Sequence, residues 1–245
     1  MTKDKHLVVA VSRPGPAHED KGKTWNHGIQ RVEILPGNIG YLNLTAFFRP
    51  EEASEAIAAA MQILRNADAL ILDVRENTGG SPDTVALVAS YLFDGPSFPL
   101  FEIVPRSGAG GGKYGTREVP GRNGERPVFV LTSSATFSGG EGLAFLLQER
   151  DRAEVIGERT AGAANPGRPY RVGDTFEVTI PNGRLRCELS GKNWEGAGVE
   201  PDMKTQAATA EAVAHTRALQ RLQPIPETPQ RVERAKLFCR NRSPP

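Results

Sequence analysis

One segment of the chain, from Pro127 to Leu147, constrains the fold more than any other. It begins with an apolar run that ends at Leu131, continues with small and polar residues as far as Ser138-Gly-Gly-Glu141, and ends in a second apolar run. This order is typical of a buried strand, a tight loop and the start of an apolar helix. The segment therefore predicts a layered α/β fold.

The same alternation of strands and helices runs along most of the chain. Strands are expected at 32–35, 40–44, 69–74, 127–131 and 154–157, and helices at 50–66, 82–93, 138–148 and 207–222. A β-rich stretch is expected at 168–189, with Pro181-Asn-Gly as a hairpin turn. We expect one domain at 1–222, with its core at about 30–205, and a polar, loosely ordered tail at 223–245.

Composition excludes several classes of function. The 245 residues carry 30 lysines and arginines against 29 aspartates and glutamates, so no basic surface for nucleic acid or membranes is expected. Neither the cysteines, Cys187 and Cys239, nor the four histidines have the spacing of a disulfide framework or a metal site. No apolar run is long enough to span a bilayer, and the polar start is not a signal peptide. The chain as written is expected in the cytoplasm, or exported if a region before its start is missing.

Ser138 stands where the predicted loop turns into the predicted helix, and two interpretations of it are open. N–H groups at a helix start are unpaired and lie at the positive end of the helix dipole, so they would stabilise negative charge beside a nucleophilic serine. Gly139 and Gly140 would let a carbonyl carbon approach, with the Gly139 N–H aimed at an oxyanion. The alternative is a capping box in which Ser138 and Glu141 only satisfy the helix start.

The segment from Asp73 to Gly80 follows a predicted buried strand and precedes a helix. Ligands of α/β sheets bind outside the carboxyl ends of strands, and the paired glycines Gly79 and Gly80 could offer backbone N–H groups to an anion. The alternative is a plain tight turn in which Arg75 pairs with Asp73.

Two later loops are further candidates for a site. The small-residue loop 157–167 could line a cleft or could simply connect two strands. The loop 193–202 holds Trp194 and Glu195, and a carboxylate there could orient a base. An exposed acid in a turn is the commoner case.

A serine nucleophile needs a base, and four histidines could supply one. His18 lies in a polar loop and His215 on the late helix. His6, which precedes a strand-like run, and His27 are the two serious candidates.

Five motifs occur along the chain in the order Gly40-Tyr-Leu42, Leu72-Asp-Val-Arg-x-Asn-x-Gly-Gly80, Leu131-Thr-Ser-x-x-Thr-Phe-Ser-x-x-Glu141, Gly157-Glu-x-Thr-x-Gly162 and Gly196-x-Gly-Val-x-Pro-Asp202. With them the chain resembles, from about His6 to Asp202, the protease core of the tail-specific (C-terminal processing) serine proteases. It is similar in particular to the branch of interphotoreceptor retinoid-binding protein and the tricorn protease core. The resemblance implies a crotonase-like ββα layered core with an additional β-rich segment.

The resemblance also implies roles for the matching residues. Ser138 would be the nucleophile, with Gly139 and either Gly79 or Gly80 as donors of an oxyanion hole. The substrate cleft is expected at Thr136, Phe137, Thr160 and Gly162.

The partner of the nucleophile differs between branches of the family. The processing proteases use a lysine, and the matching position here is Ala163, so a Ser–Lys dyad is not expected. The tricorn-like arrangement uses a histidine and a glutamate, which match His6 and Glu195 here. If Glu195 lies too far away, Glu141 or Glu158 would replace it.

The chain is therefore predicted to be a serine peptidase that hydrolyses a peptide or protein substrate without a metal or cofactor. One alternative is a non-catalytic module that binds apolar ligands of the retinoid or fatty-acid type in the same cleft, and another is a truncated, inactive paralogue. Related chains carry an α-helical region before this start and a peptide-binding PDZ insert. Both are expected to be absent, since the first 40 residues cannot hold a PDZ domain, and no oligomeric state is predicted.

Overall fold

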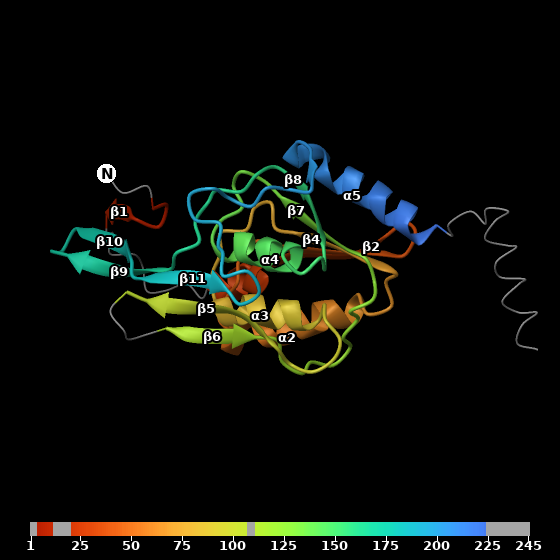
Figure 1. The fold of residues 1–245 in the computed structure, drawn as a ribbon, viewed down its shortest axis with the longest axis horizontal. Coiled ribbons are helices and arrows are strands. Elements are labelled where there is room, and N and C mark those ends of the chain that lie inside the picture. The colour runs from red at the N-terminus through yellow and green to blue at the C-terminus, as the bar shows by residue number, and fades with distance from the viewer. Residues whose placement is uncertain (1–3, 12–20, 107–110, 224–245) are drawn as a thin grey trace, which may run out of the picture.

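The computed structural model of the chain describes residues 4–11, 21–106 and 111–223. Its centre is a six-stranded sheet with the strand order β12-β8-β7-β4-β3-β2 (Figure 1). These strands are β2 (Ile29–Leu35), β3 (Ile39–Leu44), β4 (Ala69–Asp73), β7 (Val128–Thr132), β8 (Glu154–Gly157) and β12 (Met203–Lys204). β2 is antiparallel to β3, and the other neighbouring strands are parallel.

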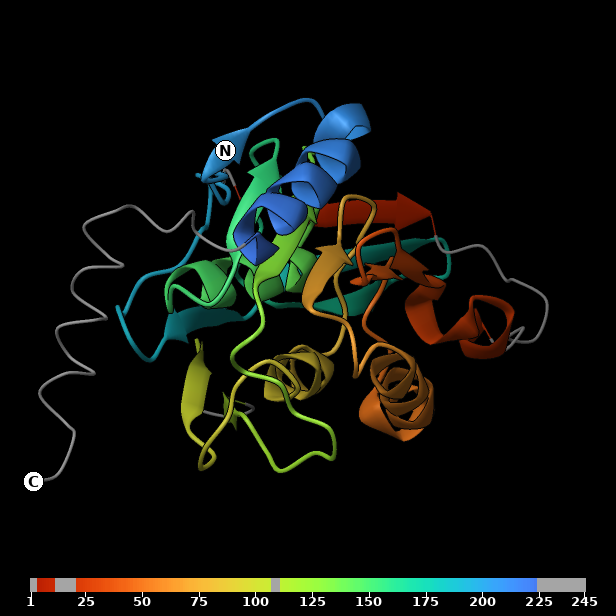
Figure 2. The same cartoon turned by 90° about the vertical axis from the view of Figure 1, so that its right-hand side faces the viewer.

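Helices cover both faces of this sheet (Figure 2). One face is covered by α2 (Pro50–Ile63), α3 (Pro82–Ser90) and α4 (Gly139–Gln148), and the other by α5 (Ala207–Leu222). Successive residues of β4 point to opposite faces, so Leu70 and Leu72 join the larger core cluster while Ala69 and Ile71 pack on the α5 side. This double burial explains why β4 is a continuous apolar run.

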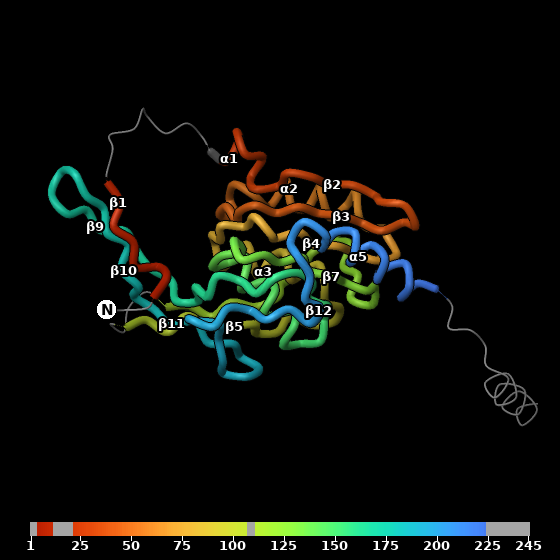
Figure 3. Tube along the Cα trace, turned by 90° about the horizontal axis from the view of Figure 1, so that it is seen from above, coloured from red at the N-terminus to blue at the C-terminus, as the bar shows by residue number. Residues whose placement is uncertain are grey.

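Two smaller sheets extend the molecule beyond the layered core. One has the order β11-β5-β6 and the other β1-β10-β9. Their strands are β1 (Val8–Val11), β5 (Pro99–Pro105), β6 (Gly112–Gly115), β9 (Gly167–Val172), β10 (Phe176–Pro181) and β11 (Gly183–Cys187). Figure 3 shows β1, β9 and β10 together at one end of the molecule. A short helix, α1 (Lys21–Thr24), and a 3₁₀ turn, η1 (Asn26–Gly28), precede β2.

The predicted fold class is confirmed, because the core is a layered α/β arrangement with an additional β-rich part. The expected hairpin at Pro181-Asn-Gly is wrong: β10 pairs with β1 and β9, whereas β11 pairs with β5. Turn residues favour a change of direction, but long-range pairing decides which sheet each strand joins. β5 and β6 are strands that the sequence did not indicate.

Other expectations concern the ends of the chain. The predicted tail lies, except for Gln223, outside the described residues, so the division into a domain and a tail stays a prediction. Within the described ranges, no helix combines the length and apolar character needed to cross a membrane.

The carboxyl ends of β3, β4, β7 and β8 lie at one edge of the central sheet, and the loops that follow them meet there.

Candidate active site

Ser138 lies at the turn between β7 and α4, at the edge where the parallel strands end. It is the N-cap residue of α4 and has backbone angles of φ +50° and ψ −112°. Residues with a side chain rarely adopt a positive φ, and such strain is concentrated at functional sites. The Ser138 N–H donates a hydrogen bond to Oε2 of Glu141 at 2.8 Å, which fixes the turn. This capping bond uses the backbone of Ser138, so a cap and a nucleophilic role are compatible.

His6 reaches Ser138 from a distant part of the chain. Its Nε2 lies 3.1 Å from Ser138 Oγ, a distance at which the hydroxyl can donate its proton to the imidazole. Oδ1 of Asp4 accepts a hydrogen bond from the backbone N–H of His6 at 3.0 Å, and this bond fixes the turn that precedes β1. The His6 ring packs on Phe137, with 4.9 Å between the ring centroids.

The other histidines have different surroundings. The His27 ring meets the Phe48 ring edge-on at 6.3 Å, and Nε2 of His215 lies 2.7 Å from the carbonyl oxygen of Pro36. His18 lies outside the described residues. Of the histidines that the structure describes, His6 is the one within hydrogen-bond distance of Ser138.

The surroundings of His6 favour a neutral imidazole. Burial lowers the pKa of His6 from its ordinary value of 6.5, because a desolvated ring disfavours the charged form. The carboxylates of Asp4, Glu195 and Glu141 act in the opposite direction and raise this pKa, but burial has the larger effect. A neutral ring at pH 7 can accept a proton at Nε2.

Glu195 brings a carboxylate to the same ring. Asp4, His6 and Glu195 each offer one nitrogen or oxygen atom, and these three atoms lie within 4.8 Å of one another. Oε2 of Glu195 accepts the N–H groups of Ala164 and Asn165 at 2.8 and 2.9 Å. Oε1 of Glu195 and Nδ1 of His6 are both buried without a hydrogen-bond partner in the described part of the chain. Nδ1 of His6 lies 4.0 Å from Oδ1 of Asp4, so the carboxylates of Asp4 and Glu195 both lie near the ring and either can orient it.

The same three side chains are where a metal ion could bind. One imidazole nitrogen and two carboxylate oxygens suit a divalent cation such as zinc. Such an ion would bind the His6 ring, so metal binding would compete with a role of His6 as a base.

Gly79 packs against Ser138, and Gly80 packs against the backbone of Phe47. A Cβ atom on Gly79 would lie 2.7 Å from Cβ of Ser138 and 3.0 Å from the nitrogen of Gly139, so no side chain fits there. The Gly79 N–H donates to Oδ1 of Asn77 at 2.8 Å. The Gly80 N–H has no hydrogen-bond acceptor among the described residues, and Gly139 begins α4, where N–H groups lack a partner within the helix. The unpaired N–H groups beside Ser138 are therefore those of Gly80 and Gly139.

Glu141 is fully buried and ties a second loop to the nucleophile turn. Besides the Ser138 N–H, its carboxylate accepts the Thr160 hydroxyl at 2.5 Å and the N–H groups of Gly162 and Ala163 at 2.6 and 2.9 Å. These donors compensate for the burial of the charge. Sequence reasoning placed Glu141 as a helix cap and missed this wider role, since the Ser-x-x-Glu spacing reveals only the local bond.

Three of the residues expected in the substrate cleft make hydrogen bonds to other loops. They are Thr136, Thr160 and Gly162. The Thr136 hydroxyl is fully buried and donates to the carbonyl of Val74 at 2.8 Å, while Thr160 and Gly162 are buried and bind the Glu141 carboxylate. These three residues hold loops together, and their predicted place in the substrate cleft stays a prediction. Small residues in loops can either line a cleft or join neighbouring loops, and the sequence alone does not distinguish these two roles. Phe137 is half-buried beside the base.

Glu158 and Ala163 serve the structure of the loops. Glu158 accepts the N–H groups of Ala207 and Ser134, each at 3.1 Å, and these bonds lower the pKa of its carboxyl. It therefore caps the start of α5 and lies apart from the His6–Ser138 pair. Ala163 is fully buried, with its N–H on Glu141.

An apolar cavity of about 80 Å³ adjoins Ser138. Ser138, Gly80 and Gly139 form part of its wall. The rest is largely apolar and includes Val85, Phe101, Ile103, Leu146, Leu185 and Trp194. Trp194 precedes Glu195, so one loop both builds the cavity and supplies the carboxylate beside His6.

Comparisons with known proteins all find peptidases of one kind. The profile of peptidase family S41 matches residues 38–205. The carboxyl-terminal-processing peptidase 2, chloroplastic, of Arabidopsis thaliana is 28% identical over 187 residues, which is 70% of this chain and 34% of that protein. The carboxyl-terminal-processing protease of Synechocystis is 34% identical over 140 residues, which is 54% of this chain and 30% of that protein.

Solved structures share the fold. The photosystem II D1 C-terminal processing protease has a TM-score of 0.56 at 26% identity, over 72% of this chain and 45% of that chain. Mature CPAF has a TM-score of 0.57 at 18% identity, over 78% of this chain and 52% of that chain, and this likeness concerns the fold alone.

The matches cover a large part of this chain but a smaller part of its relatives. The chain spans about a third of the length of the curated relatives it matches. The family profile, in contrast, covers more than half of this chain and includes the Asn77–Gly80 and Ser138–Glu141 motifs. The predicted family is thereby confirmed, while the narrower likeness to the tricorn branch stays a prediction. The chain belongs to peptidase family S41.

Proposed function

We propose that this chain is a serine peptidase in which Ser138 is the nucleophile, His6 the general base and Glu195 the carboxylate that orients His6. The observation that carries the proposal is the 3.1 Å distance between Nε2 of His6 and Oγ of Ser138. His6 would take the hydroxyl proton as Oγ attacks the scissile carbonyl carbon, and would later give it to the leaving amine. Membership in peptidase family S41 supports peptide-bond hydrolysis as the reaction.

The negative charge of the tetrahedral intermediate would be held by the N–H groups of Gly80 and Gly139. Both are unpaired, and the positive end of the α4 dipole adds to their effect. Gly79 would have a different role, since its N–H is already bonded to Asn77 and its missing side chain leaves room for the nucleophile.

The substrate would be a peptide or protein with a small apolar side chain next to the scissile bond. The cavity of about 80 Å³ adjoins Ser138 and has a largely apolar wall, so such a side chain would be desolvated there as the carbonyl meets Oγ.

The rival function is binding of a retinoid or fatty acid without catalysis. Pockets for ligands of that size measure roughly 300–1,000 Å³. The cavity at Ser138 is much smaller than this, at about 80 Å³. The paired Ser138 and His6 would also have no role in such a binder, nor in an inactive paralogue.

A fluorophosphonate probe tests the proposal directly. We expect covalent labelling of the purified chain at Ser138, located by peptide mass spectrometry, together with hydrolysis of an unstructured protein such as casein. Ser138→Ala is the matched control and should show neither. Binding of retinol or a fatty acid by a folded chain that neither reacts with the probe nor hydrolyses casein would favour the rival.

A further inference from the structure

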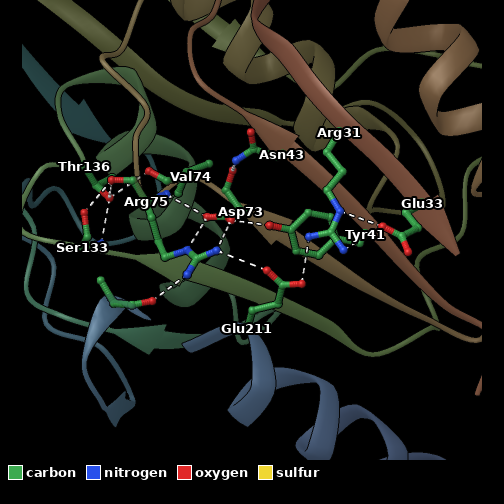
Figure 4. A network of polar contacts seen from close by, with 11 residues as sticks. Arg31, Glu33, Tyr41, Asn43, Asp73, Val74, Arg75, Ser133, Thr136 and Glu211 are labelled. Carbon is green, nitrogen blue, oxygen red and sulfur yellow. Dashed lines mark hydrogen bonds and ion pairs between the residues drawn. The ribbon is translucent and has the colours of Figure 1, made fainter. Parts of the chain in front are cut away.

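A network of polar side chains lies at the end of β4 (Figure 4). Its centre is Asp73, a residue that is only 2% exposed. Arg75 binds both oxygens of this carboxylate, with Nε 2.9 Å from Oδ1 and Nη2 2.6 Å from Oδ2. The Tyr41 hydroxyl also donates to Oδ2. The bond to Asp73 raises the pKa of Arg75, so the guanidinium stays charged.

The same guanidinium reaches helix α5. Nη1 of Arg75 donates to the carbonyl oxygen of Ala207 at 2.6 Å, and Nη2 lies 3.4 Å from Oε2 of Glu211. Oε1 of Glu211 accepts a hydrogen bond from Arg31 at 2.9 Å. The beginning of α5 is therefore fastened to the end of β4 through one side chain.

The backbone N–H of Arg75 also donates to Oδ1 of Asp73, at 3.0 Å, whereas its carbonyl oxygen is fastened to the loop that precedes Ser138. The Ser133 hydroxyl donates to the carbonyl oxygen of Arg75 at 2.5 Å. Two residues further on, the Asn77 carbonyl accepts the Phe137 N–H at 2.9 Å. Asn77 also accepts the Gly79 N–H, so the loop that continues to Gly80 is held in register with the loop that continues to Ser138.

We propose that Arg75 is a positioning residue: by anchoring its own backbone between α5 and the Ser133 hydroxyl, it sets where the Gly80 N–H lies relative to Ser138. This inference rests on the proposed peptidase function. Oxyanion donors act at about 2.7–3.1 Å from the developing charge, and a misplacement of about 1 Å can cost on the order of a hundredfold in rate. A residue that fixes the donor loop without touching substrate would thus affect the chemical step.

The chemistry of the network supports positioning over stability alone. A buried ion pair is often no more stabilising than apolar residues of the same volume. A planar guanidinium, however, has several donors in a fixed geometry, so it fixes the relative positions of the acceptors that it binds. Arg75 is also accessible, because its side chain is 19% exposed and lines an open cleft of about 510 Å³. A small cation could therefore enter beside Asp73 if the side chain were removed.

The test compares Arg75→Ala and Arg75→Lys with the wild-type chain. For Arg75→Ala we expect kcat to fall about tenfold to a hundredfold with KM nearly unchanged. Lysine keeps the charge but cannot bind Asp73 and Ala207 together, so Arg75→Lys should restore only a small part of kcat. Added guanidinium at millimolar concentration should raise kcat of Arg75→Ala but not of the wild type, a response that a general loss of stability would not produce.

Arg217→Ala is the matched control, because Arg217 also fastens α5 to the sheet. Its guanidinium binds Glu154 of β8 at 2.8 and 3.0 Å, away from the nucleophile. We expect this variant to lower the melting temperature while kcat stays unchanged. If Arg217→Ala lowers kcat as much as Arg75→Ala, or if Arg75→Ala keeps its kcat, the positioning role is overturned.

If Arg75→Ala fails to fold, Ser133→Ala tests the positioning role of Arg75 instead. It removes the hydrogen bond from Ser133 to the Arg75 carbonyl and the bond from the Ala135 N–H to Ser133, and it leaves the ion pairs and the longer 3.4 Å contact from the Thr136 hydroxyl in place. A lower kcat with unchanged KM supports the proposal, and an unchanged kcat overturns it. A wild-type chain that neither labels nor turns over would refute the peptidase function itself, which separates that failure from the failure of Arg75 positioning.

Discussion

Nε2 of His6 and Oγ of Ser138 lie 3.1 Å apart, although 132 positions separate the two residues in the sequence. His6 precedes β1, and β1 reaches the rest of the molecule by pairing with β10, which in turn pairs with β9. β9 follows the loop whose N–H groups are held by Glu141 and Glu195. His6, the proposed base, is thus held by a small outer sheet, and Ser138, the proposed nucleophile, by the central one.

Replacement of Ser138 should separate activity from stability. Ser138→Ala removes the proposed nucleophile, so turnover should vanish, while the free energy of unfolding changes by no more than about 1 kcal/mol. Ser138→Gly should also be inactive but more stable than Ser138→Ala, because glycine adopts the observed φ of +50° without strain. Casein hydrolysis and urea unfolding of both variants check this. Residual turnover in pure Ser138→Ala would refute the role.

His6→Ala should lower kcat/KM by orders of magnitude, and its residual activity should lack the acidic limb of the pH–rate profile, because that limb reports protonation of the base. His27→Ala is the control and should keep the profile, since its ring contacts Phe48 instead of the nucleophile. The measurement is kcat/KM between pH 4 and 9. An inactive His27→Ala beside an active His6→Ala would reverse the assignment.

The position of the acidic limb should depend on Asp4. Burial lowers the pKa of His6 below 6.5, so in the wild type kcat/KM should decline only as the pH falls below that value. The Asp4 carboxylate raises this pKa, and Asp4→Asn removes its charge while an amide oxygen can still accept the His6 N–H. The limb should therefore move to lower pH in Asp4→Asn. A shift to higher pH would contradict the electrostatic explanation.

The parts of the fold that sequence predicts well are those fixed by local burial. The runs at β4 and β7 are apolar throughout because both faces are covered, and the turn at Ser138 is marked by small residues followed by Glu141. The partners of β5 and β11 could not be predicted in this way, because their pairing joins segments about 80 residues apart.

The site shows the same division between local and long-range information. Ser138 and Glu195 stand out by residue type and motif, whereas the burial of Thr136 and Thr160 follows from hydrogen bonds that cross from one loop to another. The bond between the Gly79 N–H and Asn77 is local, but residue types alone do not say which glycine N–H stays unpaired. Tertiary contacts settle that choice.

Glu195→Gln should lower kcat by roughly a hundredfold or more, with a smaller change in KM, because a group that orients a base contributes about 10²–10⁴-fold. Gln keeps the volume and one acceptor for the Ala164 and Asn165 N–H groups but loses the charge beside His6. Glu200→Gln is the control: its ion pairs with Arg159 and Lys204 are on the surface, so kcat should hardly change. Equal losses in both variants would exclude a specific role for Glu195.

Gly79→Ala tests whether close packing at the nucleophile matters for the reaction. Gly79 has a φ of +91° and Gly95 a φ of +87°, so an alanine at either position incurs similar backbone strain, about 1–2 kcal/mol. The two sites differ in space: a Cβ on Gly79 would lie 2.7 Å from Cβ of Ser138, whereas a Cβ on Gly95 would have nothing within 4 Å.

Both variants should therefore lose stability, but only Gly79→Ala should displace Ser138 and lower kcat, by about a hundredfold or more. Fluorophosphonate labelling rates, measured beside urea unfolding curves, distinguish the two effects, since labelling reports the reactivity of Ser138 without substrate binding. Equal labelling rates in folded Gly79→Ala and Gly95→Ala would show that the nucleophile tolerates the shift, and the contact between Gly79 and Ser138 would then have no catalytic importance.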